Sequence, residues 1–235
     1  MIFSGDWHGK FDYIKELIIK LDIQNDDIIQ VGDFGVGFNF DDLTKLHVFN
    51  YFLAHRNLHV YAIRGNHDDP RYFMGRYMNI FSNLHLVPDY TLLEIQGHKI
   101  FCVGGAISID RLRMKREMEK EESAGTLPIY FENEKFVLNT DRLDYFKNVG
   151  IDVVVTHTAP SYCLPYTKGS YDESDTKLPE ELIRERADCA ILMDILLETN
   201  PIEKHFYGHF HKTFITEDRG VTHYCLNINE LKEVY

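Results

Sequence analysis

The chain has 235 residues, of which 44% are apolar and 26% charged, and 37 acidic against 25 basic side chains give a formal net charge of −12. This length favours one compact domain, and we expect residues 1–235 to form it, with a charged insertion near 107–125. The acidic balance argues against general affinity for nucleic-acid backbones, although a local basic patch could still bind them.

The sequence shows no sign of secretion or membrane insertion. No apolar run approaches the length of about 18 residues that a membrane-spanning helix needs. The second residue already begins an expected strand, so a signal peptide is not expected. Four cysteines occur without any C-x-x-C pairing, mostly in apolar runs: Cys102, Cys163, Cys189 and Cys225. They are typical of reduced, buried thiols, and we expect a cytoplasmic protein without a membrane partner.

Strands and helices alternate in the first third of the chain. Apolar runs and segments with apolar residues at helical spacing predict strands at 1–4, 27–31 and 59–63 and helices at 11–21 and 41–54. This β-α-β-α-β order predicts a parallel sheet with right-handed crossovers.

The rest of the chain is richer in hairpins. The expected elements there are hairpins at 92–103 and 213–228, strands at 152–155 and 204–207, and a helix at 189–197. Residues 109–125 are highly charged and form either a solvated helix or a flexible excursion, and residues 161–181 have the composition of a loop.

Five short polar segments are spread along the chain, and four of them follow an expected strand. They are Gly5-Asp6-Trp7-His8-Gly9, Gly32-Asp33, Gly65-Asn66-His67-Asp68, Thr156-His157 and Gly208-His209-Phe210-His211. Open α/β sheets build sites from side chains at the C-terminal tips of strands. Carboxylate, imidazole and amide groups suit Mn, Fe, Zn and similar divalent ions, and their number suffices for two metals. Taken singly, Asp6 and Asp33 could be helix caps, and His157 a hydrogen-bonded core histidine.

The order of these segments resembles the signature of the calcineurin-like metallophosphoesterase superfamily, and the match extends from residue 5 to residue 211. The resemblance implies an α/β fold, a four-layer α-β-β-α sandwich of two mixed sheets flanked by helices, with both expected hairpins in the second sheet. It also implies a phosphoesterase that depends on two metal ions and attacks phosphorus through a hydroxide bridging them.

The resemblance implies a role for each matched residue. The implied metal ligands are Asp6, His8, Asp33 and His211 for the first ion, and Asp33, Asn66, His157 and His209 for the second. His67 would orient the phosphate or act as general acid, and Asp68 would orient His67 through a hydrogen bond. Manganese is the favoured metal, with Fe, Zn, Ni or Co as alternatives.

Departures from the protein-phosphatase branch of the superfamily bear on the substrate. That branch has an arginine soon after G-D and lacks the closing G-H-x-H, whereas this chain continues from Asp33 to Phe34 and keeps the closing motif. Arg64, before Gly65, is shared with that branch. We therefore expect a short phosphodiester or a small phosphomonoester as substrate. The alternatives are a Ser/Thr-type phosphoprotein phosphatase and a catalytically weak nucleotide-binding regulator.

Three arginines are candidate substrate-binding residues: Arg64, Arg111 and Arg113. From the charged segment, Arg111, Arg113 or Arg116 could reach the site as a phosphate clamp, with a solvated helix face as the alternative. The loop at 161–175 could be a lid or a specificity loop. The sequence leaves the oligomeric state and the physiological substrate open.

Overall fold

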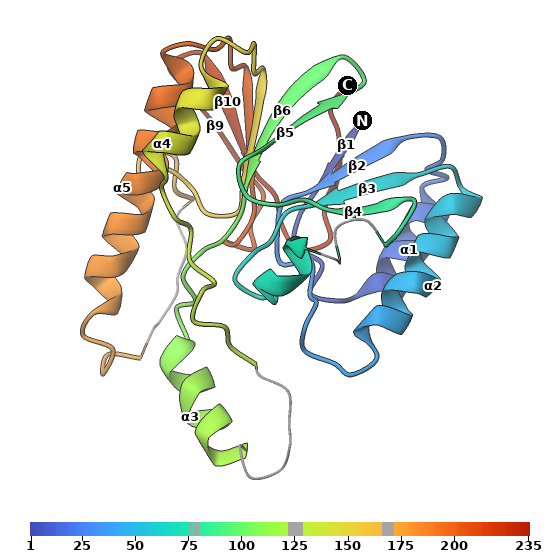
Figure 1. Ribbon diagram of the computed structural model, residues 1–235, viewed down its shortest axis with the longest axis horizontal. Helices are drawn as coiled ribbons and strands as arrows, with labels where there is room; N and C mark the ends of the chain where they lie inside the picture. Colours follow the sequence, from blue (N-terminus) through green and yellow to red (C-terminus); the bar gives the residue numbers. More distant parts are fainter. Residues whose placement is uncertain (76, 78–79, 122–128, 166–171) are drawn as a thin grey trace.

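A computed structural model describes residues 1–75, 77, 80–121, 129–165 and 172–235 (Figure 1). In these ranges the strands are β1 (Ile2–Ser4), β2 (Asp27–Gln30), β3 (His59–Ala62), β4 (Leu84–Leu86), β5 (Thr91–Ile95), β6 (His98–Val103), β7 (Val153–Thr156), β8 (Lys204–Tyr207), β9 (Phe214–Asp218), β10 (Val221–Cys225) and β11 (Leu231–Glu233). The α-helices are α1 (Phe11–Lys20), α2 (Asp42–His55), α3 (Arg111–Glu121), α4 (Thr140–Leu143) and α5 (Leu178–Leu197).

The strands form two mixed sheets. The first has the order β11-β1-β2-β3-β4, and the second has the order β5-β6-β7-β8-β10-β9. In each sheet the central strands are parallel, and antiparallel partners stand at the edges: β11 in the first, and β5 and β9 in the second. Both predicted hairpins, β5–β6 and β9–β10, belong to the second sheet as expected.

The two sheets pack face to face around a shared apolar core. Phe3 of β1 and Phe206 of β8 stack across the interface with ring centroids 3.7 Å apart, and both are fully buried. Ile29 and Val155 belong to the same core. Strands buried on both faces are typical of parallel sheets, which explains the continuous apolar runs in the sequence.

Helices cover the outer faces of both sheets. Helix α1 buries Ile14 and Ile18, one turn apart, in the core beneath the first sheet, where α2 also packs. Helix α5 buries Leu192 and Leu196 against the second sheet. Figure 1 shows α1 and α2 on one side of the molecule and α4 and α5 on the other. The four-layer α/β sandwich is therefore confirmed.

Two sequence expectations need correction. The helix expected at 189–197 begins eleven residues earlier, at Leu178, because Pro179 suits its first turn and buried Glu185 obscures its apolar periodicity. The loop expected up to residue 181 therefore ends before α5, and its residues 166–171 lie outside the described ranges.

The charged segment contains a helix, α3, which projects from the sandwich in Figure 1. Of the two expectations for this segment, the structure therefore shows the helix. Residues 122–125 of the expected insertion lie outside the described ranges. Among the helices in the described ranges, none combines the length and apolar character needed to cross a membrane.

Candidate metal centre

The polar segments meet at one edge of the sandwich, because each follows a strand whose carboxyl end points there. The first sheet contributes the segments after β1, β2 and β3, and the second contributes those after β7 and β8. Together these loops assemble the seven predicted metal ligands, which we call the candidate metal centre: Asp6, His8, Asp33, Asn66, His157, His209 and His211.

One half of the candidate metal centre consists of Asp6, His8, Asp33 and His211, whose donor atoms lie within 4.8 Å of one another. Nε2 of His211 is 3.3 Å from Oδ2 of Asp6 and 3.2 Å from Nε2 of His8. Nε2 of His8 is 3.9 Å from Oδ2 of Asp33. This half contains two carboxylates and two imidazoles around a common point, a donor set that suits a divalent transition metal.

The other half is built around the side-chain oxygen of Asn66. Its Oδ1 lies 3.1 Å from Nε2 of His157 and 2.8 Å from Nδ1 of His209. Nε2 of His157 is also 3.2 Å from Oδ1 of Asp33. These four side chains form a second donor set of carboxylate, amide and imidazole groups.

Asp33 joins the two halves. Its Oδ1 faces His157, whereas its Oδ2 faces His8 and is buried without a hydrogen-bond partner among the described residues. A buried carboxylate oxygen without a partner is unfavourable, and a metal ion beside it removes that cost. The residues therefore fit two divalent ions that share one carboxylate.

The backbone at this edge is held in unusual conformations. His8, Asp33, His209 and His211 have positive φ angles of 47°, 54°, 67° and 50°. Such values are uncommon outside glycine and concentrate at functional sites. Gly65 allows close approach here, because a Cβ atom on it would lie 2.0 Å from Oδ1 of Asp33. The glycines of the motifs therefore provide room for the ligands.

The carboxylates of the centre raise the pKa values of two of its histidines. Burial alone would lower the pKa of His157, but Asp33 and Asp6 raise it to about 9. A hydrogen bond to Asp6 likewise raises the pKa of His211. In the metal-free protein the imidazole of His157 therefore holds a proton at neutral pH, where a metal ion would bind.

Metal binding should therefore depend on pH. A metal must displace the His157 proton at any pH below about 9, so the affinity for Mn²⁺ should rise as pH increases from 6.5 toward that value. Isothermal titration calorimetry in buffers of different ionisation enthalpy measures the proton release. Equal affinity at the two ends of this range, with no proton release, would contradict the expectation.

His67 lies beside the centre, with its ring centroid 5.4 Å from that of His8 and its backbone N–H donating to Oδ1 of Asp33. Asp68 does not act as expected. Its carboxylate accepts hydrogen bonds from the backbone N–H groups of Phe34, Gly35 and Gly65, because it is buried beneath these loops. The expectation that it orients His67 is therefore corrected: Asp68 holds the loops after β2 and β3 together.

The sequence analysis missed two residues that position Asn66. Nδ2 of Asn66 donates to Oγ of Ser108 at 2.9 Å, and that hydroxyl donates to Oε2 of Glu134 at 2.7 Å. The chain of hydrogen bonds turns Oδ1 of Asn66 toward His157 and His209. Neither residue lies in a motif, so no local signal marks it.

Replacing Ser108 with Ala should weaken metal binding at the Asn66 half of the centre roughly 10- to 100-fold, the range seen for groups that orient ligands. The fold should persist, since the change removes one hydroxyl. Metal content after dialysis is the measurement, with Ser82→Ala, which removes an exposed hydroxyl, as the control. Unchanged occupancy would show that Asn66 needs no such support.

The three candidate arginines bind elsewhere. Arg64 is buried and donates to Asp89 and to backbone carbonyls at 134–135. Arg111 pairs with Asp175 and Glu181, and Arg113 pairs with Asp110 and Glu117. None of the three lines the cavity at the metal centre. Arg116 likewise pairs with Asp172.

Two cavities open beside the centre and share His67. One, of about 370 Å³, is lined by Arg186 of α5 together with Ser108, Phe210 and centre residues. The other, of about 340 Å³, lies toward His8, Phe38 and Ile129. Arg186, which the sequence analysis did not name, is the arginine in this lining, and burial lowers the pKa of its guanidinium.

Solved structures similar to this chain include a dimetal phosphatase from Danio rerio, at 12% identity and a TM-score of 0.52, covering 97% of this chain and 87% of that one. Others are a phosphopantetheinyl hydrolase from Mycobacterium tuberculosis (13%, TM-score 0.46, covering 96% and 89%) and an archaeal phosphodiesterase (15%, TM-score 0.39, covering 97% and 84%). At 12% identity the likeness to the Danio rerio protein shows a shared fold.

The comparison with curated proteins finds no significant match. The sequence model of calcineurin-like phosphoesterases, in contrast, matches residues 1–213, which include all five polar segments. The chain therefore belongs to the calcineurin-like phosphoesterase family and is a metal-dependent phosphoric ester hydrolase.

Proposed function

We propose that this chain hydrolyses short phosphodiesters with two divalent metal ions bound at the candidate metal centre. The observation that carries the proposal is Asp33, whose two carboxylate oxygens face two separate donor sets while one of them lacks a hydrogen-bond partner. We propose manganese as the metal; the donors are oxygen and nitrogen atoms without a thiolate, a set that suits Mn, Fe, Zn, Ni or Co.

The seven ligands would hold the ions, which supply positive charge for the phosphate and lower the pKa of the attacking water. His67 lies next to His8 and lines both cavities, so its imidazole can hydrogen-bond a phosphate oxygen or protonate the leaving group. Phe210 and Ile109 give the larger cavity apolar walls, which suit the organic part of an ester.

The two cavities favour a diester over a monoester. A phosphodiester carries two organic substituents, and cavities on both sides of His67 give each of them a place. A phosphomonoester fills one side only. Arg64, the feature shared with protein phosphatases, is occupied by Asp89, which supports a substrate other than a phosphoprotein.

Arg186 should contribute to phosphate binding, because its partly buried guanidinium lines the larger cavity. Replacing it with Ala should lower kcat/KM by roughly 10- to 100-fold, the value of a charge-assisted hydrogen bond of about 1.5–3 kcal/mol. Steady-state kinetics measure the loss. Arg184→Ala on the same helix is the control, since Arg184 lines a different cavity. Equal kinetics for Arg186→Ala and wild type would exclude this role.

The proposed function is tested with metal-free protein, reconstituted with Mn²⁺ and assayed on bis-p-nitrophenyl phosphate and on p-nitrophenyl phosphate. We expect turnover of both compounds, a higher kcat/KM for the diester, and loss of both activities with chelator. A higher value for the monoester would overturn the diester preference. Tight nucleotide binding without turnover of either compound would instead indicate the regulator.

A further inference from the structure

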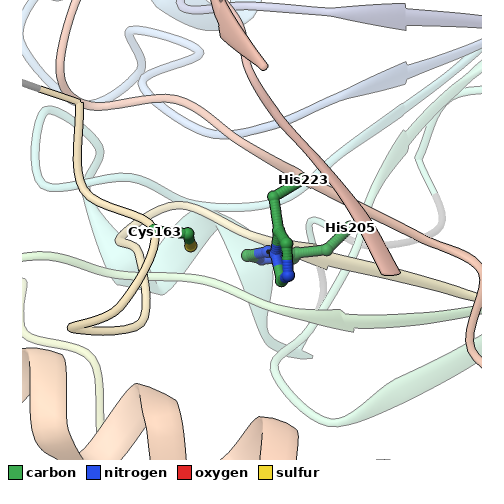
Figure 2. Close-up of side chains that lie close together, drawn as sticks. All are labelled: Cys163, His205 and His223. Atoms are coloured by element: carbon green, nitrogen blue, oxygen red, sulfur yellow. Dashed lines mark hydrogen bonds between the residues drawn. The ribbon is translucent and has the colours of Figure 1, made fainter. Parts of the chain in front are cut away.

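A second cluster of metal-ligating side chains lies outside the candidate metal centre: Cys163, His205 and His223 (Figure 2). Their donor atoms all lie within 4.8 Å of one another, and each residue is at most 2% exposed. His205 and His223 stand opposite each other on the paired strands β8 and β10. Figure 2 shows the side chain of Cys163 beside the two imidazole rings.

The cluster lies on the outer face of the second sheet. Phe206 points into the core between the sheets, so its neighbour His205 points to the opposite face. Cys163 reaches this face from the loop that follows His157. Three segments that are far apart in the sequence therefore converge on one buried point.

The hydrogen bonds leave one imidazole nitrogen without a partner. The hydroxyl of Thr156 donates to the carbonyl of Thr158, so its oxygen accepts a hydrogen bond from Nε2 of His205 at 2.9 Å. Nδ1 of His205 then accepts from Nδ1 of His223 at 3.0 Å. Nε2 of His223 remains a buried acceptor without a hydrogen-bond partner among the described residues.

The hydrogen bond from His205 to Thr156 is of the kind that orients a metal-binding histidine. Such a histidine donates its other ring N–H to an oxygen atom, as His205 does to Thr156. Burial lowers the pKa of His205 well below its usual value and that of His223 to about 4. Both imidazoles are therefore neutral at pH 7, with lone pairs available to a metal.

The surroundings hold the cluster in place. The hydroxyl of Tyr207 donates to the carbonyl of Cys163 at 2.6 Å, which fixes the loop. The ring of Tyr162 lies edge-on to His223, and Arg219 covers Tyr162 while pairing with Asp194 of α5. The three donors are thus buried and covered by these side chains.

We propose that Cys163, His205 and His223 bind a zinc ion. One thiolate and two imidazoles are zinc ligands. Donor atoms that share a tetrahedral zinc lie roughly 3.3 to 3.8 Å apart, given the usual bond lengths. The donor atoms of the cluster all lie within 4.8 Å of one another, so a shared zinc ion requires only small side-chain movements.

Binding replaces one proton by the metal. The thiol of Cys163 loses its proton to solvent and its sulfur binds the ion. His223 gives the lone pair of Nε2, and His205 gives that of Nδ1, which exchanges its hydrogen bond with His223 for the metal, so both imidazoles stay neutral. The ion fixes the loop after His157 to β8 and β10, and β8 leads directly to His209. With three protein donors, a solvent molecule would take the fourth tetrahedral position, and the zinc would support two ligands of the candidate metal centre from behind.

Cobalt tests the proposal, because Co²⁺ bound to a cysteine has a near-ultraviolet thiolate-to-cobalt charge-transfer band. The candidate metal centre contains no thiol, so cobalt bound there does not give this band. Metal-free, reduced full-length protein is titrated with Co²⁺. We expect the band to saturate at the intensity of one thiolate-bound cobalt per chain, whatever Co²⁺ the candidate metal centre also takes up, and to disappear when Zn²⁺ is added.

Two variants and one control complete the test. Cys163→Ser should abolish the band, and His223→Gln should weaken Co²⁺ binding at least tenfold while keeping the thiol. Cys102→Ser, which alters a buried thiol of the core between the sheets, should leave the band unchanged. Circular dichroism verifies that each variant folds. Absence of the band in wild type, or its persistence in folded Cys163→Ser, overturns the proposal, and the wild-type result stands even if a variant fails to fold.

Discussion

Replacing Asp33 with Asn should reduce phosphodiesterase activity by more than about a hundredfold, beyond the range for groups that only orient a ligand, and should remove at least one metal ion. The amide is nearly isosteric but uncharged, and its nitrogen cannot bind a metal. Asp33 is also fully buried, and nearby histidines hold its pKa well below the usual range even though burial opposes this. The native side chain is therefore an ionised carboxylate between two donor sets.

Metal content and turnover, measured on the same preparation, check this prediction. Asp69→Asn is a matched control, because Asp69 is equally buried near the site but pairs with Arg71. The control should keep both metals and most of its activity. If folded Asp33→Asn retained two metals and wild-type turnover, the proposed centre would be wrong.

Replacing His67 with Ala should slow turnover roughly 10²- to 10⁴-fold, the contribution of a positioned acid or base, without changing metal content. The side chain of His67 lies at the junction of the two cavities and next to His8, where it reaches a substrate bound at the centre. The loss should fall mainly on kcat for an ester with a poor leaving group. It should be smaller for p-nitrophenyl esters, whose leaving group needs no proton.

His47→Ala is the control for this prediction, because His47 lies on α2, packs against Phe81 and belongs to no motif. It should leave kinetics and metal content unchanged. Loss of metal from His67→Ala would show instead that His67 supports the ligands directly.

The fold follows from features that a sequence displays well. Strands buried on both faces, such as β2 and β7, give continuous apolar runs, and α1 shows its apolar face at helical spacing. Apolar runs and helical spacing are weaker in β4, β11 and the first half of α5. Strands β4 and β11 were not predicted individually, because their sequences Leu-His-Leu and Leu-Lys-Glu contain no continuous apolar run, unlike the equally short β1. The first half of α5 was hidden by buried Glu185.

The candidate site likewise contains residues that the sequence predicts and residues that it does not. Its seven ligands lie in short motifs at strand ends, and the structure brings all of them together, although their metal binding stays a prediction. Residues that act from other parts of the chain have no such signal. Arg186 lies on a helix without a motif, whereas the more conspicuous Arg111 is neutralised by Asp175. Tertiary pairing of this kind cannot be read from spacing.

The candidate metal centre also has a mechanical consequence. Each half takes ligands from both sheets: the half that contains Asp6 is completed by His211, about two hundred residues later, and the half that contains Asn66 is completed by His157. Every ion bound there would cross-link the two halves of the sandwich at their open edge. Metal loading should therefore slow amide hydrogen exchange in the loops of both sheets together. The ions proposed for catalysis would thus also stabilise the packing of the two sheets.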